Sequence, residues 1–182
     1  MKCIKHLLNR IRGEQDIKML IKRGLKVGGN LTRMSGCILD PSHCWHIEIG
    51  NDVILAPNVH ILAHDASSKI FLNYTRVANV KIGNRVFIGA GTIVLPGVVV
   101  GDDVIIGAGS IVSKSIPSNS VAIGSPAKVI CSLDDYIEKE KKKMCDENVF
   151  DSEYTLRNSK LSADHKKRMI EACEKFGQAF ID

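Results

Sequence analysis

A six-residue repeat runs through the middle of this chain, between residues 82 and 117. In each hexad the first position is a branched aliphatic residue, the second is most often glycine, and the fifth is small or β-branched. The first positions are Ile82, Ile88, Val94, Val100, Ile106 and Val112, and the fifth positions are Val86, Thr92, Val98, Val104, Ser110 and Ile116. An α-helix repeats about every 3.6 residues and a strand about every 2, so neither produces this period by itself. The repeat therefore constrains the fold more than any other feature of the sequence.

The period predicts short strands that wind into a triangular prism. Each face holds one strand whose first-position side chain points inward, a turn follows, and three faces complete one coil. Successive coils then hydrogen-bond along the prism axis at the usual strand spacing of about 4.8 Å. The second-position glycines, such as Gly83, are expected to supply positive φ angles at the corners. The alternative is an antiparallel meander with turns roughly every 8 to 12 residues, but the six-residue register does not slip here.

The same repeat occurs in a shorter block upstream, at Ile49, Leu55 and Ile61. From Ile61 to Ile82 there are 21 residues, which is not a multiple of six, so part of this interval must leave the stack. The segment 64–80 carries polar and aromatic residues without the repeat, and we predict that it is a loop excluded from the prism. A loop held on a rigid frame is a natural place for a binding site.

A weaker repeat begins earlier, at Val27 and Leu39, and it places Arg33 and Trp45 in the inward column. Before it, apolar residues with helical spacing predict a helix within residues 14–22 that glycines then end. Those residues are Ile17, Leu20 and Ile21. The prism is therefore expected to follow a helical segment.

The C-terminal region is also predicted to be helical. Residues 133–144 form a charged helical pattern, residues 145–159 are expected to be a loop, and Ser162 is placed to cap a second helix. An apolar stripe would then face the prism or a neighbouring subunit, or form a groove for a partner. The stripe consists of Met169, Cys173, Phe176 and Phe180.

Composition argues against several classes of protein. The net charge is +5 but aromatic residues make up only 5% of the chain, so the basic residues indicate solvated helix faces and attraction for an anionic small molecule, not nucleic acid. The sequence has no run of about 18 apolar residues, so no membrane-spanning helix is expected. The six cysteines are scattered, as expected for free thiols in a reducing cytoplasm. Cys37, His43, Cys44 and His46 lie close in sequence but lack a recognised zinc spacing, so no metal is expected.

The run from Ile82 to Ile130, with its closing phrase Gly124-Ser125-Pro126-Ala127-Lys128, resembles the hexapeptide-repeat acyltransferases. It is most similar to their sugar O-acetyltransferases of the galactoside and maltose type, and the resemblance covers residues 47–131. It implies an all-β core that is a left-handed parallel β-helix, a homotrimer with active sites between neighbouring prisms, and acetyl-CoA as the acetyl donor. The expected organisation is a helical segment at 1–26, the β-helix acetyltransferase domain at 27–131 and a helical extension at 132–182.

The resemblance also implies a catalytic residue. His64 opens the excluded loop, where the family carries its catalytic histidine, and histidine is the natural base near neutral pH for removing a hydroxyl proton. His60 is expected to be an ordinary outward-facing residue. No serine or cysteine nucleophile with a partner base is evident, so the acceptor hydroxyl is expected to attack the thioester directly. Asp65 either orients a substrate hydroxyl or begins a turn, and it is assigned with Tyr74 to acceptor binding.

Five further positions match the family's coenzyme-binding residues. The pantetheine arm is expected along the corners that contain Ala90 and Ala108, with an oxyanion-stabilising backbone N–H near Ala90. A serine–lysine pair and a second lysine would hold the rest of the coenzyme; these are Ser113, Lys114 and Lys128. The chain departs from close relatives at two positions, because Phe87 stands where they carry tryptophan and Cys131 where a second basic residue can occur.

The predicted function is acetyl-CoA-dependent O-acetylation of a sugar hydroxyl. Asp65 follows His64 where galactoside-type relatives carry proline, which favours transferases that modify surface polysaccharides. The alternatives are a serine or xenobiotic acetyltransferase on the same fold, or a non-catalytic β-helix scaffold. A γ-type carbonic anhydrase would need three histidines around zinc, some of them on later coils. Residues 81–130 contain none.

Overall fold

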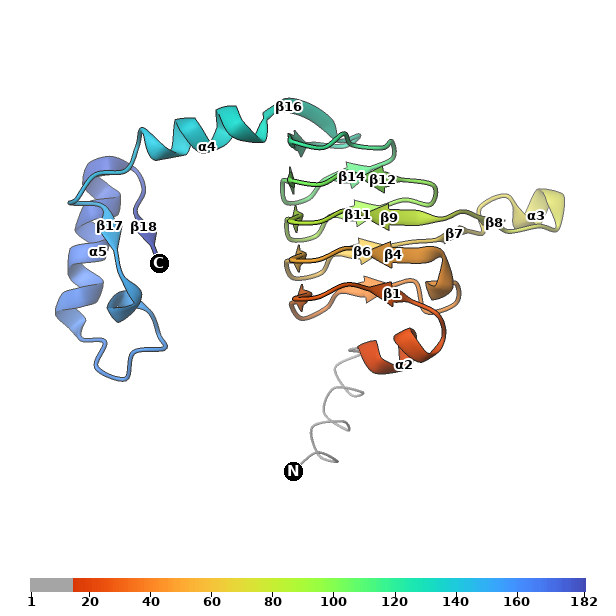
Figure 1. The fold of residues 1–182 in the computed structure, drawn as a ribbon, viewed down its shortest axis with the longest axis horizontal. Helices are drawn as coiled ribbons and strands as arrows, with labels where there is room; N and C mark the ends of the chain where they lie inside the picture. Colours follow the sequence, from red (N-terminus) through yellow and green to blue (C-terminus); the bar gives the residue numbers. More distant parts are fainter. Residues whose placement is uncertain (1–14) are drawn as a thin grey trace. The chain divides into compact units, whose positions relative to one another are not determined.

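The computed structural model describes residues 15–182, which divide after Asp134 into two compact units. The N-terminal unit contains a stack of short strands, with an arm that projects from one level of the stack (Figure 1). The predicted N-terminal helical segment falls partly outside the described residues, since these begin at Gln15. Within them, α2 (Ile17–Lys22) begins after Asp16, whose side chain accepts a hydrogen bond from the Lys18 N–H.

The strands form three faces of a prism, and neighbouring coils pair in parallel along each face. The first sheet contains β1 (Lys26–Val27), β4 (Ile47–Ile49), β9 (Val80–Ile82) and β12 (Val99–Val100). The second contains β2 (Thr32–Arg33), β5 (Ile54–Leu55), β10 (Phe87–Ile88), β13 (Val104–Ile106) and β15 (Ser120–Ile123), with β16 (Lys128–Ser132) antiparallel at its end. The third contains β3 (Ile38–Leu39), β6 (His60–Ile61), β11 (Ile93–Val94) and β14 (Ile111–Val112).

The strand register matches the hexads read from the sequence. Ile82 lies opposite Ile49, and Ile88 lies opposite Leu55, so first positions stack on first positions. These side chains are fully buried, and so are the fifth-position residues such as Val86 and Thr92. The hexads therefore build one continuous aliphatic core, and the predicted parallel prism is confirmed.

The expected role of the second-position glycines is wrong. Gly83 does not have a positive φ; a Cβ there would lie 2.6 Å from the backbone of Gly101 on the next coil. The left-handed residue is instead the fourth of several hexads, for example Arg85 with φ 52° and Gly91 with φ 69°. Glycine thus permits close approach of coils at one position, while the corner is made two residues later.

The first coil differs from the prediction at one of its two unusual inward positions. Arg33 lies opposite Leu55 as expected, and its guanidinium donates to the carbonyl of Gln15 at 2.5 Å, which closes this end of the core. Trp45 is not inward. It lies in a short 3-10 helix, η1 (Cys44–His46), where Cys44 is the buried residue and the indole is 50% exposed.

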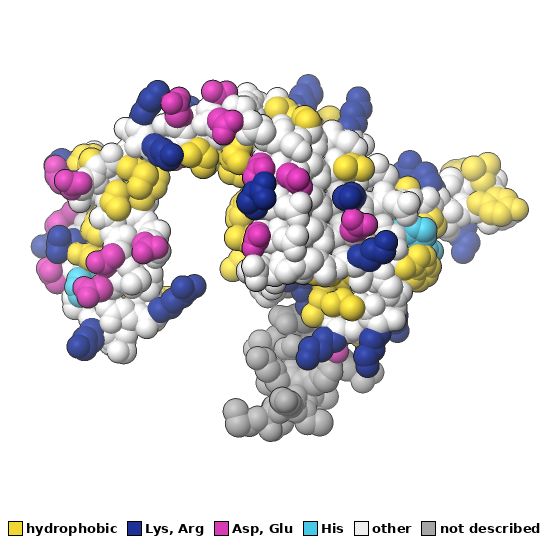
Figure 2. All heavy atoms as spheres, in the orientation of Figure 1, with side chains coloured by type: hydrophobic (Ala, Val, Ile, Leu, Met, Phe, Trp, Pro, Cys, Tyr) yellow, Lys and Arg dark blue, Asp and Glu magenta, His cyan; other side chains and the backbone are white. Residues whose placement is uncertain are grey.

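The segment that breaks the repeat forms an arm with structure of its own. It comprises β7 (His64–Asp65), α3 (Lys69–Leu72) and β8 (Arg76–Val77), with β7 and β8 antiparallel. The two ends of the arm meet where the Ala78 N–H donates to the Ala63 carbonyl at 3.0 Å. Its outer part is apolar and exposed, since Ile70 and Phe71 are 82% and 80% accessible. Figure 2 shows hydrophobic side chains gathered over this arm.

The C-terminal region begins with α4 (Leu133–Lys141) and continues through β17 (Val149–Phe150), η2 (Ser152–Tyr154), α5 (Ala163–Phe176) and β18 (Phe180–Ile181). Ser162 caps α5, as its position predicts, because its side chain accepts from the His165 N–H. The predicted loop 145–159 is wrong in part, since it contains β17, which pairs with β18. Phe180 therefore belongs to a strand and not to the apolar stripe of α5. Between residues 15 and 182, no helix has the length and apolar character needed to cross a membrane.

Candidate active site

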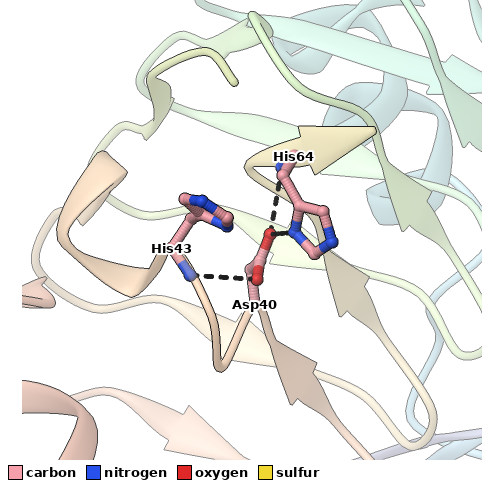
Figure 3. Close-up of side chains that lie close together, drawn as sticks. All are labelled: Asp40, His43 and His64. Atoms are coloured by element: carbon pink, nitrogen blue, oxygen red, sulfur yellow. Dashed lines mark hydrogen bonds and ion pairs between the residues drawn. The ribbon is translucent and has the colours of Figure 1, made fainter. Parts of the chain in front are cut away.

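The arm begins with the residue that the sequence assigns as a base. His64 follows β6 and forms a hydrogen bond through Nδ1 with Oδ2 of Asp40 at 2.5 Å. The His64 side chain is 31% exposed and the Asp40 side chain is completely buried. Figure 3 shows the imidazole with one nitrogen on the carboxylate and the other directed away from it. A surface-accessible imidazole is thus held from behind by a buried acid.

Asp40 is fixed by the backbone around it. Its Oδ2 also accepts from the N–H groups of Ala63 and His64 at 2.9 and 3.0 Å. Its Oδ1 accepts from the N–H groups of Ser42 and His43 at 3.1 and 3.2 Å. Burial alone would raise the pKa of this carboxyl, but the hydrogen bonds from His64, Ala63 and Ser42 together outweigh it and hold the pKa below its usual range. Asp40 is therefore ionised at neutral pH.

This ionised partner determines which nitrogen of His64 is available. A carboxylate can only accept, so Nδ1 of the imidazole carries a proton toward Asp40. In the neutral imidazole the lone pair is then on Nε2, which points away from the acid (Figure 3). The pair is arranged to take a proton at Nε2 and to stabilise the resulting positive charge at Nδ1.

From the sequence, Asp40 lies with His43 and Cys44 in the region where the family resemblance implies an acidic site residue, but it could not be matched to that role. The strand register locates it. Leu39 pairs with Ile61, so Asp40 lies next to Leu62, with Asp40 on the earlier of the two coils. Its N–H donates to the Ile61 carbonyl at 2.9 Å, which places its carboxyl under the start of the arm. The aspartate is thus 24 residues before His64 in sequence but one coil away in space.

A cluster of aromatic rings lies beside this pair. The ring of His43 lies 4.8 Å from that of His64 and 5.4 Å from that of Trp45. His46 continues the cluster, and its Nδ1 pairs with the Asn79 side chain at 2.6 Å. Nδ1 of His43 is buried without a hydrogen-bond partner among the described side chains. The corner below His64 is therefore lined by rings.

The structure also addresses the possible zinc site. The thiols of Cys37 and Cys44 point to backbone carbonyls, those of Ala56 at 3.1 Å and Leu20 at 3.6 Å. They do not join a histidine cluster. In residues 15–182 the one group with ligand-type atoms close together is Asp40, His43 and His64, whose atoms lie within 4.8 Å of one another. Here the Asp40 oxygens already accept five protein hydrogen bonds.

Two predicted acceptor-binding residues lie on the arm. The Asp65 carboxylate accepts from the Ser67 N–H at 2.9 Å and from Arg76 at 3.0 Å. The Ser67 bond is the main reason that the pKa of Asp65 is lowered, and Arg76 contributes less. These contacts correspond to the turn-forming alternative. Tyr74 is 78% exposed and lies three residues before Val77, the partner of His64 in the hairpin.

The predicted coenzyme residues fall into three places. Ala90 and Ala108 are exposed and stacked on neighbouring coils, because the Gly109 N–H donates to the Ala90 carbonyl at 2.8 Å. Ser113 and Lys114 are exposed and directly follow β14. Lys128 is exposed at the start of β16.

These residues do not converge on His64 within one chain. Ala90 and Ala108 lie between the second and third sheets, whereas His64 and Lys114 lie between the third and first sheets. A side of the prism of about six residues is roughly 15–20 Å long at about 3.3 Å per residue. The alanine corner and the histidine corner are therefore on opposite edges of one face.

Comparisons with known proteins agree with the fold and the repeat. Residues 79–114 match the family model described as "Bacterial transferase hexapeptide (six repeats)". Protein CapG of Staphylococcus aureus is 41% identical over 146 residues, which cover 76% of this chain and 81% of CapG. Galactoside O-acetyltransferase of Escherichia coli (strain K12) is 41% identical over 94 residues, 50% of this chain, and the chain spans only 46% of that protein.

Solved structures give the same result. A galactoside acetyltransferase in complex with coenzyme A matches with a TM-score of 0.54 and 28% identity, covering 74% of this chain and 80% of that one. Neighbours of this kind imply that the prism is a left-handed β-helix. Since CapG is matched over most of its length and the acetyltransferases share both the hexads and the prism, the chain belongs to the hexapeptide-repeat acetyltransferases and is an acyltransferase.

Proposed function

We propose that this enzyme transfers an acetyl group from acetyl-CoA to a sugar hydroxyl, with His64 as general base. The observation that carries the proposal is the pairing of a surface-accessible imidazole with the buried, ionised Asp40 at 2.5 Å. Such a pair holds the base in one tautomer and one orientation, which is what abstraction of a hydroxyl proton requires. The coenzyme A complex of a galactoside acetyltransferase with the same fold supports acetyl-CoA as the donor.

The reaction follows from the two nitrogens of His64. Nε2 removes the acceptor hydroxyl proton while the hydroxyl oxygen attacks the thioester carbonyl carbon. The tetrahedral intermediate then collapses, the C–S bond breaks, and the imidazolium returns its proton to the leaving thiolate of CoA. Asp40 stabilises the imidazolium through Nδ1 and is a positioning residue, because it does not touch the reacting atoms.

The coenzyme is assigned to the outer surface of the prism. The exposed corner of Ala90 and Ala108 lets the pantetheine arm approach the backbone, and a backbone N–H near Ala90 stabilises the oxyanion. Ser113, Lys114 and Lys128 are exposed and can meet the polar and phosphate groups of CoA.

A homotrimer completes this site in the proposal. The alanine corner and the histidine corner lie on opposite edges of one face, so in this proposal a second copy brings its His64 to the pantetheine held on the alanine corner. The exposed apolar part of the arm, with Ile70, Phe71 and Leu72, supports contact with a neighbouring copy. The arm would then bring Asp65 and Tyr74 to the acceptor at that boundary.

The acceptor is proposed to be a sugar of a surface polysaccharide. Asp65 after His64 supports this assignment over free galactosides, and a cytoplasmic location fits the free cysteines of residues 37–173. Serine and xenobiotic hydroxyls are the competing acceptors, and a scaffold without catalysis would not bind acetyl-CoA.

The test measures thiol release from acetyl-CoA with a panel of sugars, oligosaccharides, serine and xenobiotic alcohols. We expect turnover with sugars and a loss of about 10²- to 10⁴-fold in kcat for His64→Ala, the usual value of a general base. His60→Ala is the matched control, because His60 lies in β6 just before the arm, and this variant should retain activity. Full activity in His64→Ala would contradict the proposal, and so would a failure to turn over any of the sugars tested.

A further inference from the structure

Trp45 is the one tryptophan in the chain, and its ring belongs to the cluster of rings that includes the proposed base. Its indole is 5.4 Å from the His43 ring, which in turn is 4.8 Å from the His64 ring. Half of the Trp45 surface is accessible, although the residue is large and apolar. Burying such a ring normally contributes favourably, so an exposed indole in the same ring cluster as the proposed base offers apolar area that a ligand can cover.

The position of Trp45 is fixed on both sides. Before it, Cys44 is completely buried and its thiol contacts the Leu20 carbonyl at 3.6 Å. After it, His46 is held by Asn79 at 2.6 Å. Behind it lies Gly24, where an added Cβ would come within 2.8 Å of the Trp45 Cβ. The backbone is thus tightly held while the indole projects outward, which is how a rigid binding residue is built.

We infer that Trp45 is an acceptor subsite, an aromatic platform on which the C–H face of a pyranose ring stacks. The face of an indole carries partial negative charge and a large apolar area, and it attracts the weakly positive C–H groups on one side of a sugar. Ligand sites combine such aromatic surfaces with a few polar groups that set orientation. Here His64 is the polar group that meets the reacting hydroxyl.

The ring contacts also bear on the length of the acceptor. The His43 ring contacts both the Trp45 ring and the His64 ring, and in this proposal a sugar stacked on the indole lies beside the base and not on it. The stacked sugar is therefore an anchor, and the next sugar along the glycan presents its hydroxyl to Nε2. The acceptor is an oligosaccharide or polysaccharide and not a free monosaccharide. This inference rests on the proposed function and deepens it.

Because Trp45 is the sole tryptophan, its fluorescence reports directly on this subsite. The experiment uses full-length His64→Ala protein, which binds without turnover. Maltotriose, galactotriose and a trimer of N-acetylglucosamine are titrated, each against its monosaccharide. We expect a saturable change in emission with at least one trimer, at a concentration at least tenfold lower than for the monosaccharide. No change with any trimer, or equal binding of trimer and monosaccharide, overturns the inference.

Kinetics of Trp45 variants provide the second arm. Trp45→Ala should raise the KM for the best oligosaccharide at least tenfold, while Trp45→Phe, which keeps an aromatic face, should change it less than threefold. The KM for acetyl-CoA should stay within twofold in both. If Trp45→Ala unfolds, Trp45→Phe and the fluorescence titration still decide the matter. A saturable fluorescence change without acetyl transfer would support the subsite and refute the proposed function. Acetyl transfer that Trp45→Ala leaves unchanged would support the proposed function and refute the subsite.

Discussion

Replacement of Asp40 by asparagine isolates the charge behind His64 with little change in side-chain size. Three donors converge on one oxygen of Asp40, namely the N–H groups of Ala63 and His64 and the His64 ring. The asparagine must keep its oxygen there, so its NH₂ group will face the N–H groups of Ser42 and His43. The variant therefore loses two long hydrogen bonds and the negative charge.

The magnitude follows from these contacts. A buried donor left unsatisfied costs about 1–3 kcal/mol. Ser42 is exposed, so its N–H can bond to water and only the His43 N–H should bear this cost. The free energy of unfolding should therefore fall by about 1–3 kcal/mol. A hydrogen bond to a charged group contributes about 1.5–3 kcal/mol, and about 1.4 kcal/mol corresponds to tenfold in rate, so kcat should fall by roughly 10- to 150-fold. Because Asp40 is fully buried, the KM for acetyl-CoA should stay unchanged.

The assay is thiol release at saturating acceptor, together with urea unfolding of the same preparations. Asp103→Asn is the matched control, because it makes the same chemical change at an exposed carboxylate paired with Arg85 on a prism corner. It should alter neither kcat nor the unfolding midpoint appreciably. A folded Asp40→Asn enzyme with kcat within twofold of the wild type would refute the role assigned to the pair.

Three further predictions concern stability. The pKa of Asp40 is lower in the folded protein than its unfolded value of about 3.9, so the unfolded chain takes up the proton first, and stability is lost as pH falls from about 5 toward the folded pKa. Urea midpoints measured over this range should therefore depend less on pH in Asp40→Asn than in the wild type. The same dependence of the midpoint on pH in both proteins contradicts the assignment. Gly83→Ala would place a Cβ 2.6 Å from the Gly101 backbone and should lower the melting temperature strongly. Gly91→Ala should lower it far less, because the added Cβ meets no atom within 4 Å and the left-handed backbone costs only about 1–2 kcal/mol. The reverse order in thermal melts would exclude the close approach of coils as the cause. Ser162→Ala removes the cap of α5 and should cost about 0.5–2 kcal/mol in stability, detected as faster amide hydrogen exchange in α5, whereas unchanged exchange would show that the cap does not contribute.

The prism was predictable because its cause is local and repeated. Ile82, Ile88 and their equivalents mark the inward positions, and the structure stacks them in the register that the hexads require. The glycine column was recognised for a wrong reason. The period indicates that position 83 requires glycine. The reason is visible only in the stacked coils, where the backbone of Gly101 lies too close for a Cβ, and it is not a left-handed φ.

The site was predictable only in part. His64 could be assigned because the family resemblance implies a catalytic histidine at the place where the count of six fails. Asp40 could not, since it lies on the weak first coil and meets His64 through the stacking of coils and not through sequence proximity. The ring of Trp45 is linked to that of His64 only by way of His43, which is likewise seen only in the folded chain. The hairpin in the arm also escaped prediction, because its residues follow no period. Residues whose roles come from contacts between coils require the register of the whole stack.

The arm leaves the prism and returns without disturbing it. Its ends are joined by the hydrogen bond between Ala63 and Ala78, and two residues later Val80 already pairs with Ile47 as if the coil were uninterrupted. Lengthening such an excursion costs only about 0.6 kcal/mol for each doubling of its length. If the arm contacts the acceptor as proposed, substrate choice and folding are thereby uncoupled, because the arm could be exchanged while the hexads continue to specify the prism.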